Sequence, residues 1–316
     1  MEVCIVFAVQ YVLVGNYGVG NFGDEALKEY FLSAFPQVEW HVLSAHPQQG
    51  EFSRLPAGIR SLFTPWWKTF GALWRSDGVV FGGGTLFTDI ESPWACFIWW
   101  WHALWARILR KKIFLTFQGI GPFKTAMGEW CGKWVVRHSA FISVRDSASY
   151  VRVQSWGLNL KVIQTCDPVF IALSSNKFNQ RTQNLLCIIP RYNSTDSFDT
   201  RASVLSKERS WDGVQILSLQ PENLEEQAVC AKLAERTKGT VISVRTLEDL
   251  AHRVRSASLV LTQRYHGAVA ALALDVPFEV VSQGAGDKLA ALIQHSAPEE
   301  WRSLAENGQE ALRMAL

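Results

Sequence analysis

Hydrophobic residues along this chain fall into short runs rich in β-branched and aromatic side chains, separated by longer segments in which apolar residues recur at helical spacing. In the first half, the short runs predict strands at Val3 to Val14, Glu39 to Ser44, Gly78 to Phe81, Ile113 to Phe117, Phe141 to Val144 and Leu160 to Gln164. The segments between them predict helices at Asp24 to Ala34, Trp94 to Leu109, Glu129 to His138 and Asp146 to Trp156. Because strands that alternate with helices are typical of parallel sheets, this pattern predicts an α/β fold.

The same alternation starts again in the second half of the chain. Its strands are predicted at Asn184 to Ile189, Val214 to Leu219, Thr240 to Ser243, Ser258 to Thr262 and Phe278 to Val281. A polar, linker-like stretch begins at Ser174, so we expect an N-terminal domain of residues 1–173 and a C-terminal domain of residues 174–316. The segment from Asp287 to Leu316 is predicted to be helical and to pack back on the first domain. Two such mainly parallel sheets, facing a central cleft, would bind ligands at the carboxyl ends of their strands.

Composition narrows the class of protein further. The 316 residues are roughly two domains' worth, and 48% hydrophobic with 19% charged residues indicates a globular chain. The 31 Lys and Arg against 29 Asp and Glu leave a net charge of only +2, so we expect no global electrostatic field that would draw the protein to nucleic acid or to an anionic membrane. Six scattered cysteines form no CxxC pair, which favours the reducing cytoplasm.

The most aromatic stretch is Trp94 to Leu109, and three basic residues follow it. It is shorter than the roughly 20 apolar residues that a spanning helix needs, and His102 and Arg107 interrupt it. Two interpretations stay open. The stretch is either a largely buried crossover helix, or an interfacial helix that rests on the inner face of the membrane and gives the protein a peripheral membrane contact.

The first glycine-rich loop follows a predicted strand and opens a predicted helix. Its Gly18, Gly20 and Gly23 have the GxGxxG spacing of a dinucleotide-binding loop. Carboxylates at Asp24 and Glu25 occupy the place of the pyrophosphate, and no acid follows the second strand, so a nicotinamide cofactor is not expected. These acids either stabilise the helix dipole or, as we expect for Asp24, face the cleft, where a carboxylate can accept a hydroxyl proton.

Glycines also follow two later strands. A tight turn needs one glycine, so Gly82-Gly83-Gly84 predicts a loop whose backbone amides approach a ligand. The segment Gln118-Gly119-Ile120-Gly121-Pro122 follows the next strand, and for it turn chemistry alone is an equal explanation.

Cationic side chains follow the strands of the second half. Arg264 and His266 lie between the end of a strand and the start of a helix, where an anion gains from amide donors and from a guanidinium. Arg191 and Lys288 follow two other strands and could add further cations, although a surface ion pair for Arg191 and a solvated position for Lys288 are the alternatives.

Six motifs occur in order along the chain: Asn16 through Glu25, Gly82-Gly83-Gly84, Gln118 through Pro122, Val144-Arg145-Asp146, Asp167-Pro168 and Arg264-Tyr265-His266. Taken singly, Arg145-Asp146 predicts a helix start and Asp167-Pro168 a domain-joining turn. Together the six motifs resemble those of the polysaccharide pyruvyl transferases. The resemblance implies two Rossmann-like domains in a glycosyltransferase B-like arrangement. It also implies transfer of pyruvate from phosphoenolpyruvate, as a ketal, to a sugar of a cell-wall polysaccharide, an exopolysaccharide or a lipid-linked precursor.

This chemistry assigns roles to the candidate residues. Phosphoenolpyruvate carries a carboxylate and a phosphate, so we expect Arg191, Arg264 and Lys288 to hold it. His266 is the expected general acid, and Asp24, from the opposite domain, is the expected base. Further substrate contacts are expected at Asn16, Asn21, Glu25, Gly83, Gly84 and Gly267.

No metal or other cofactor is expected, since the chain has no HxH or HExxH motif, although a divalent ion on Asp24 or Glu25 is left open. The lengthened first loop and Ser282-Gln283-Gly284 depart from the family's pattern and leave the acceptor sugar undetermined. Two rival functions stay open: a nucleotide-sugar glycosyltransferase on the same architecture, and a sugar-binding module without catalytic activity. The oligomeric state is not predicted.

Overall fold

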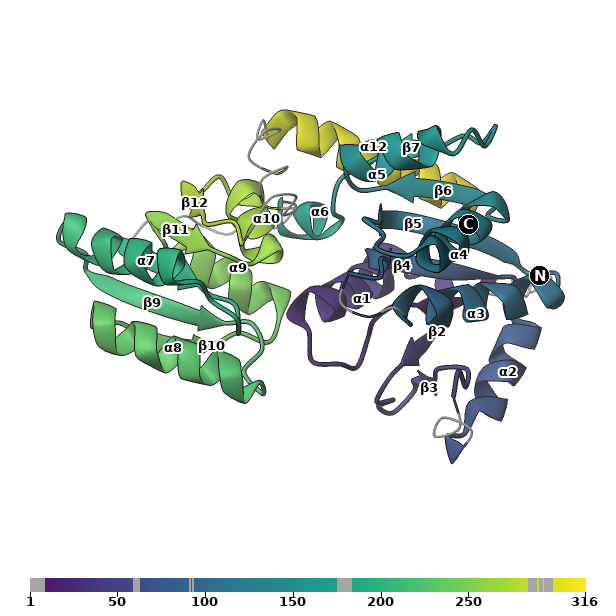
Figure 1. The fold of residues 1–316 in the computed structure, drawn as a ribbon, viewed down its shortest axis with the longest axis horizontal. Helices are drawn as coiled ribbons and strands as arrows, with labels where there is room; N and C mark the ends of the chain where they lie inside the picture. Colours follow the sequence, from purple (N-terminus) through teal and green to yellow (C-terminus); the bar gives the residue numbers. More distant parts are fainter. Residues whose placement is uncertain are drawn as a thin grey trace, which may run out of the picture. The chain divides into compact units, whose positions relative to one another are not determined.

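The computed structural model describes residues 9–58, 63–90, 92, 94–174, 184–283, 289, 292 and 298–316. The chain forms two compact units (Figure 1). The first unit comprises residues 1–19, 27–168 and 304–316, and the second comprises residues 20–26 and 169–303. The chain passes from one unit to the other after Pro168, shortly before the boundary expected after Leu173. The segment 20–26 belongs to the second unit, although it stands early in the sequence.

The first unit contains a parallel sheet of seven strands in the order β3-β2-β1-β4-β5-β6-β7. Its strands are β1 (Val9–Val14), β2 (Val38–Ser44), β3 (Phe52–Ser53), β4 (Gly78–Phe87), β5 (Lys112–Ile120), β6 (Phe141–Val144) and β7 (Ile163–Gln164). Its helices are α1 (Phe22–Ala34), α2 (Trp66–Arg75), α3 (Ala95–Ile108), α4 (Ala126–Arg137), α5 (Ser147–Ser155) and the later part of α12 (Pro298–Ala315). This strand order is that of the Rossmann fold.

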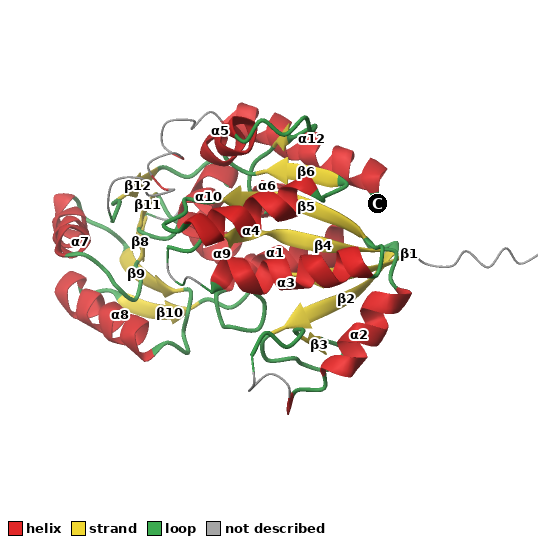
Figure 2. Cartoon of the chain, turned by 45° about the vertical axis from the view of Figure 1, so that its right-hand side comes forward, coloured by secondary structure: helices red, strands yellow, loops and turns green. Residues whose placement is uncertain are grey.

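Helices cover both faces of this first sheet, as right-handed crossovers require. The helices α2, α3 and α4 lie on one face (Figure 2). On the other face, Phe31 of α1 contacts the Phe117 ring of β5, and Tyr11 donates a hydrogen bond to the carbonyl of Leu316 at the end of the chain. The C-terminal segment therefore packs within the first unit.

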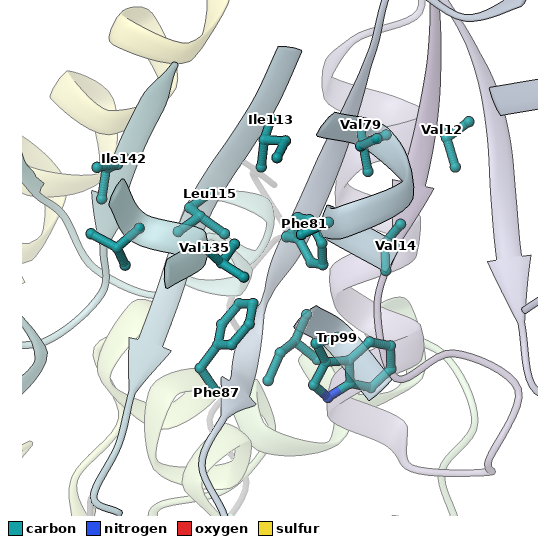
Figure 3. Close-up of a cluster of buried hydrophobic side chains, with 14 of the residues drawn as sticks. Val12, Val14, Val79, Phe81, Phe87, Trp99, Ile113, Leu115, Val135 and Ile142 are labelled. Atoms are coloured by element: carbon teal, nitrogen blue, oxygen red, sulfur yellow. The ribbon is translucent and has the colours of Figure 1, made fainter. Parts of the chain in front are cut away.

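A buried apolar cluster lies between the sheet and the helices α3 and α4 (Figure 3). Strand residues such as Val14 of β1, Phe81 of β4 and Leu115 of β5 meet Trp99 of α3 and Val135 of α4. The strands read as continuous apolar runs because both faces of the sheet are covered. This packing holds fixed the carboxyl edge of the sheet, where the family motifs of the first half gather.

The second unit contains a parallel sheet in the order β10-β9-β8-β11-β12. Its strands are β8 (Leu185–Ile189), β9 (Gly213–Ser218), β10 (Thr240–Ser243), β11 (Leu259–Thr262) and β12 (Phe278–Val280). Its helices are α6 (Val169–Ser174), α7 (Asp196–Glu208), α8 (Leu224–Thr237), α9 (Leu247–Arg255) and α10 (Tyr265–Ala273). The order repeats that of the first unit, so each unit is Rossmann-like.

The structure corrects the sequence analysis at the glycine-rich segments. Gly82, Gly83 and Gly84 do not form a loop, because β4 continues through them to Phe87. The glycine run is used instead for a strand irregularity: Gly83 and Gly84 have φ of 81° and 83°, values that residues with a side chain rarely adopt, and the register with β5 shifts beyond them. In the same way, Gln118 and Gly119 lie inside β5 rather than in a loop.

Candidate active site

The two strands at the centre of the second sheet, β8 and β11, end side by side. Ile189 pairs with Thr262, and the backbone amide of Gln263 donates to the Ile189 carbonyl at 3.0 Å. The sheet order reverses between these two strands, and open α/β sheets bind ligands in the crevice beyond such a point. Arg191 follows β8, and Arg264 caps the start of α10 after β11, so the topology brings two of the predicted cations to this edge.

Arg264 is held against the sheet by several acceptors. Its Nε donates to the Pro190 carbonyl at 3.2 Å and its Nη2 donates to Gln220 at 2.9 Å. Nη2 also forms an ion pair with Glu226, whose side chain is fully buried in the first turn of α8. Glu226 in turn accepts from the Ser218 hydroxyl at 3.0 Å and from the Gln220 amide at 2.7 Å. The guanidinium is therefore fixed in place and its charge is compensated.

The charge of this edge depends on both arginines. Burial, and after it the positive charge of Arg191, lowers the pKa of Arg264 to about 10, so the guanidinium stays protonated at neutral pH. The half-buried Arg191 donates to the side chain of Gln283, three residues after the end of β12, at 3.1 Å. Among the described residues, Arg191 has no acidic partner. Two guanidinium groups, of which one is paired with a carboxylate, leave a net positive charge at this edge.

His266 lies in the first turn of α10 and packs against the start of α1. A Cβ placed on Gly23 would lie 2.0 Å from His266 Cε1, so a glycine is needed for this approach. Segment 20–26 belongs to the same compact unit as His266, so the unit also contains Asn21, Asp24 and Glu25. The Asn21 amide donates to the Asp24 carboxylate at 2.8 Å. Asp24 was expected to come from the opposite domain, but it packs in the unit that contains His266.

Gly267 follows His266 and is buried. A Cβ at this position would lie 2.6 Å from the Thr262 hydroxyl and 2.9 Å from Ile189 Cδ1. The absence of a side chain thus lets α10 start directly on the ends of β8 and β11. Lys288, the third predicted cation, lies outside the described residues.

The remaining predicted residues belong to the first unit. Asn16 accepts from the Arg54 guanidinium at 3.3 Å, and the same guanidinium nitrogen donates to the carbonyls of Gly15 and Tyr17 at 3.2 Å and 3.1 Å. Gly83 faces Leu27, whose side chain would lie 3.1 Å from an added Cβ. The structure thus gives Gly83 a packing role, and a ligand contact of Gly83 or Gly84 stays a prediction.

Sequence analysis missed a buried cluster at the carboxyl edge of the first sheet. Arg145, just after β6, donates to Asp167 at 2.6 Å and to the Thr85 hydroxyl of β4 at 2.8 Å. Both charged side chains are almost fully buried. Asp146 caps α5 as predicted. Arg145 and Asp167, which were expected to form only a helix start and a turn, instead form a buried ion pair. The signal was available for two of the three residues, because Arg145 and Asp167 belong to separate motifs that follow the neighbouring strands β6 and β7.

No group of three or more His, Cys, Asp or Glu side chains among the described residues is arranged to hold a metal ion. None of the described helices combines the length and the apolar character that a membrane crossing requires.

The two units define a protein of the two-Rossmann-domain, glycosyltransferase B-like class. Residues 21–283 match the polysaccharide pyruvyl transferase family, and the chain belongs to that family. No curated protein sequence matches it. Solved structures with a similar fold include the UDP-GlcNAc 2-epimerase of Methanocaldococcus jannaschii in complex with UDP-GlcNAc and UDP, with 12% identity, a TM-score of 0.58 and coverage of 97% of this chain and 99% of that chain.

Two other solved structures share this fold. Anabaena Alr3699/HepE in complex with UDP and glucose has 12% identity, a TM-score of 0.55 and coverage of 96% and 94%. The UDP-N-acetylglucosamine 2-epimerase of Rickettsia bellii has 11% identity, a TM-score of 0.56 and coverage of 98% and 96%. At these identities the similarity establishes the fold.

Proposed function

We propose that the protein transfers a pyruvyl group from phosphoenolpyruvate to a sugar and forms a pyruvate ketal. The acceptor is a sugar of a cell-wall polysaccharide or exopolysaccharide, or of its lipid-linked precursor, and the reaction takes place in the cytoplasm. The observation that carries this proposal is that Arg191, Arg264 and His266 follow the ends of the neighbouring strands β8 and β11 in a chain of this family.

The donor fits the charge of this edge. Phosphoenolpyruvate is small and carries a carboxylate and a phosphate, both of which match the planar fork of a guanidinium. Arg264 is compensated by Glu226, so Arg191 and the positive end of the α10 dipole supply the net attraction. In this proposal Lys288 adds a third cation when the donor is bound, and no metal or other cofactor takes part.

Ketal formation begins with protonation of the donor. His266 donates a proton to the methylene carbon of phosphoenolpyruvate, which becomes a methyl group, and the central carbon becomes electrophilic. One sugar hydroxyl attacks this carbon, the carbon–oxygen bond to phosphate breaks, and a second hydroxyl of the same sugar closes the ring. Two hydroxyl protons are released: one returns His266 to its starting state, and the other leaves with inorganic phosphate.

Asp24 is the proposed base for the first hydroxyl, and it passes this proton to the departing phosphate, so that the proton of the second hydroxyl is the one that returns to His266. It stands in the first turn of α1, adjacent in sequence to Gly23, which packs against the His266 ring. Its hydrogen bond from Asn21 limits the rotation of the carboxylate, so it can be aimed at the sugar. Glu25 and Asn16 are proposed as further acceptor contacts.

A nucleotide-sugar glycosyltransferase is the second candidate, because the similar structure of Alr3699/HepE contains UDP and glucose. Here the two arginines would bind a diphosphate. A sugar-binding module without activity is a weaker candidate, since carbohydrate binding alone does not require two guanidinium groups at one sheet edge.

Thermal unfolding in the presence of ligands separates these candidates. We expect phosphoenolpyruvate to raise the unfolding temperature, because a ligand at 100 times its Kd stabilises the folded state by about 2.7 kcal/mol. UDP-sugars and GDP-sugars should have no effect. Arg264→Lys should reduce the stabilisation, whereas Arg245→Lys, a change at an exposed surface arginine, should not. Stabilisation by nucleotide-sugars alone would favour the glycosyltransferase.

A further inference from the structure

One face of the first unit exposes large aromatic side chains. We call it the tryptophan face, defined by Trp67 and Trp74 of α2, Trp94 just before α3, and Trp130 of α4. Their exposed fractions are 60%, 64%, 69% and 49%. Phe63, three residues before α2, is 87% exposed. Single exposed apolar residues are ordinary, but several aromatic rings on adjacent helices mark an interaction surface.

The three helices are physically joined. Figure 2 shows α2, α3 and α4 on the same face of the first sheet. Phe70 of α2 contacts the Trp105 ring of α3 with centroids 5.5 Å apart, and Trp100 of α3 contacts Trp130 of α4 at 5.5 Å. Aromatic contacts therefore link α2 to α3 and α3 to α4.

The aromatic stretch from Trp94 to Leu109 had two interpretations, a largely buried crossover helix or an interfacial helix. One side of α3 is buried in the core, as in a crossover helix; its buried residues are Cys96, Trp99, His102, Ala103 and Ala106. The most exposed rings are instead contributed by α2, by the residue before α3 and by α4. The helix α3 therefore packs beneath the tryptophan face, and the exposed tryptophans themselves belong to α2, to α4 and to the residue before α3.

The charge of the same segment is strongly positive. Residues 66–138 contain nine Lys and Arg and four Asp and Glu, a net charge of +5, so the rest of the chain has a net charge of −3. One of the four acids, Asp89, is buried and accepts hydrogen bonds from the start of α4. Exposed cations lie on the same helices, including Lys68 and Arg75 on α2 and Lys133 and Arg137 on α4.

We infer that the tryptophan face binds the surface of a bilayer that contains anionic lipids. Indole rings prefer the headgroup level of a membrane, where an apolar body and a polar N–H are both satisfied. Lys and Arg at the same level are attracted to the negative surface potential. The inference goes beyond the proposed function and does not depend on it. It would bring the enzyme to the surface at which lipid-linked sugars are found.

Sedimentation with lipid vesicles tests this inference on the full chain. We expect binding to vesicles of phosphatidylcholine with one-third phosphatidylglycerol, weaker binding to phosphatidylcholine alone, and release at high salt. Each cation near an anionic surface contributes about fivefold to partition, so Lys68→Glu with Arg75→Glu should lower it by at least about 25-fold. Trp67→Ser with Trp74→Ser should lower it on both kinds of vesicle.

Matched controls come from the second unit. Lys207→Glu with Arg302→Glu makes the same change of charge at exposed positions, and Leu224→Ser removes a side chain that is 77% exposed. These variants should bind vesicles like the natural chain. Equal losses in the control variants, or no binding to anionic vesicles at low salt, would overturn the inference.

Light scattering separates a membrane from a second copy of the chain. The Trp67→Ser, Trp74→Ser variant should keep the oligomeric state of the natural chain, and a shift to a smaller species would show that the face joins copies instead. With a water-soluble acceptor this variant should also keep full turnover. A failure of the proposed function would therefore leave the vesicle result standing, and the reverse also holds.

Discussion

Replacing Glu226 by Gln isolates the role of the carboxylate behind Arg264. The Glu226 side chain is fully buried and that of Arg264 is 11% exposed, so the pair follows the rule for buried ion pairs rather than that for surface pairs. Breaking a buried pair by removing one partner costs about 3 to 5 kcal/mol, because an uncompensated charge is left behind. Gln keeps an acceptor for Ser218 and Gln220, so we expect a loss near 3 kcal/mol, and a larger loss for Glu226→Ala.

The assay must measure the unfolding of the second unit itself. All the tryptophans except Trp211 and Trp301 lie in the first unit, so tryptophan fluorescence would report mainly the unfolding of the first unit. Hydrogen exchange of β8 and β11, followed by mass spectrometry, measures the opening of the second sheet. Inorganic phosphate or phosphoenolpyruvate should restore part of the lost stability in Glu226→Gln, because an anion can replace the missing carboxylate beside Arg264.

A double-mutant cycle decides whether this reasoning holds. Glu226→Gln with Arg264→Gln leaves no buried charge, so its destabilisation should be smaller than the sum of the two single changes, and phosphate should not rescue it. Additive losses would refute the coupling. So would a Glu226→Gln variant as stable as the natural chain.

Three further predictions concern single positions. His266→Ala should lower turnover by roughly two to four powers of ten with an intact fold, since a general acid is lost; circular dichroism and a phosphate-release assay check this, and near-normal turnover would exclude His266 from the mechanism. Gly23→Ala should also lower turnover, because the added Cβ would displace the His266 ring, and unchanged kinetics would contradict the close approach. Burial lowers the pKa of His102 to about 4, so between pH 6.5 and pH 4 the unfolded state binds more protons than the folded state. Stability should therefore fall by up to about 3 kcal/mol as the pH falls through that window, and denaturant melts of His102→Gln should lack this component.

The layer structure could be predicted from the sequence because buried parallel strands give continuous apolar runs. The predicted helix from Trp94 to Leu109 is confirmed as α3. The ends of strands were harder to predict. Three consecutive glycines favour a loop in a sequence pattern, yet Gly82 to Gly84 stay in β4, since Gln118 of β5 donates to the carbonyls of Phe81 and Gly83. Such a contact between strands has no local signal.

Some site residues also had a local signal in the sequence, whereas others are brought to the site only by the fold. Arg264 and His266 could be placed at the end of β11 because a strand, two polar residues and a helix occur in succession. Glu226 could not be found, since it lies inside an ordinary helix start of α8, and only the fold brings it to Arg264. The placement of Asp24 in the second unit also depends on packing, because the loop around it is continuous with the first strand in sequence.

Product analysis tests the central claim most directly. The protein is incubated with phosphoenolpyruvate and a panel of hexosides and lipid-linked acetylhexosamines, and products are identified by mass spectrometry while phosphate is measured. We expect a pyruvate ketal on one class of acceptor, one phosphate released for each ketal, and neither product with His266→Ala. Consumption of a UDP-sugar or GDP-sugar with formation of a glycoside, and no ketal from phosphoenolpyruvate, would contradict the account.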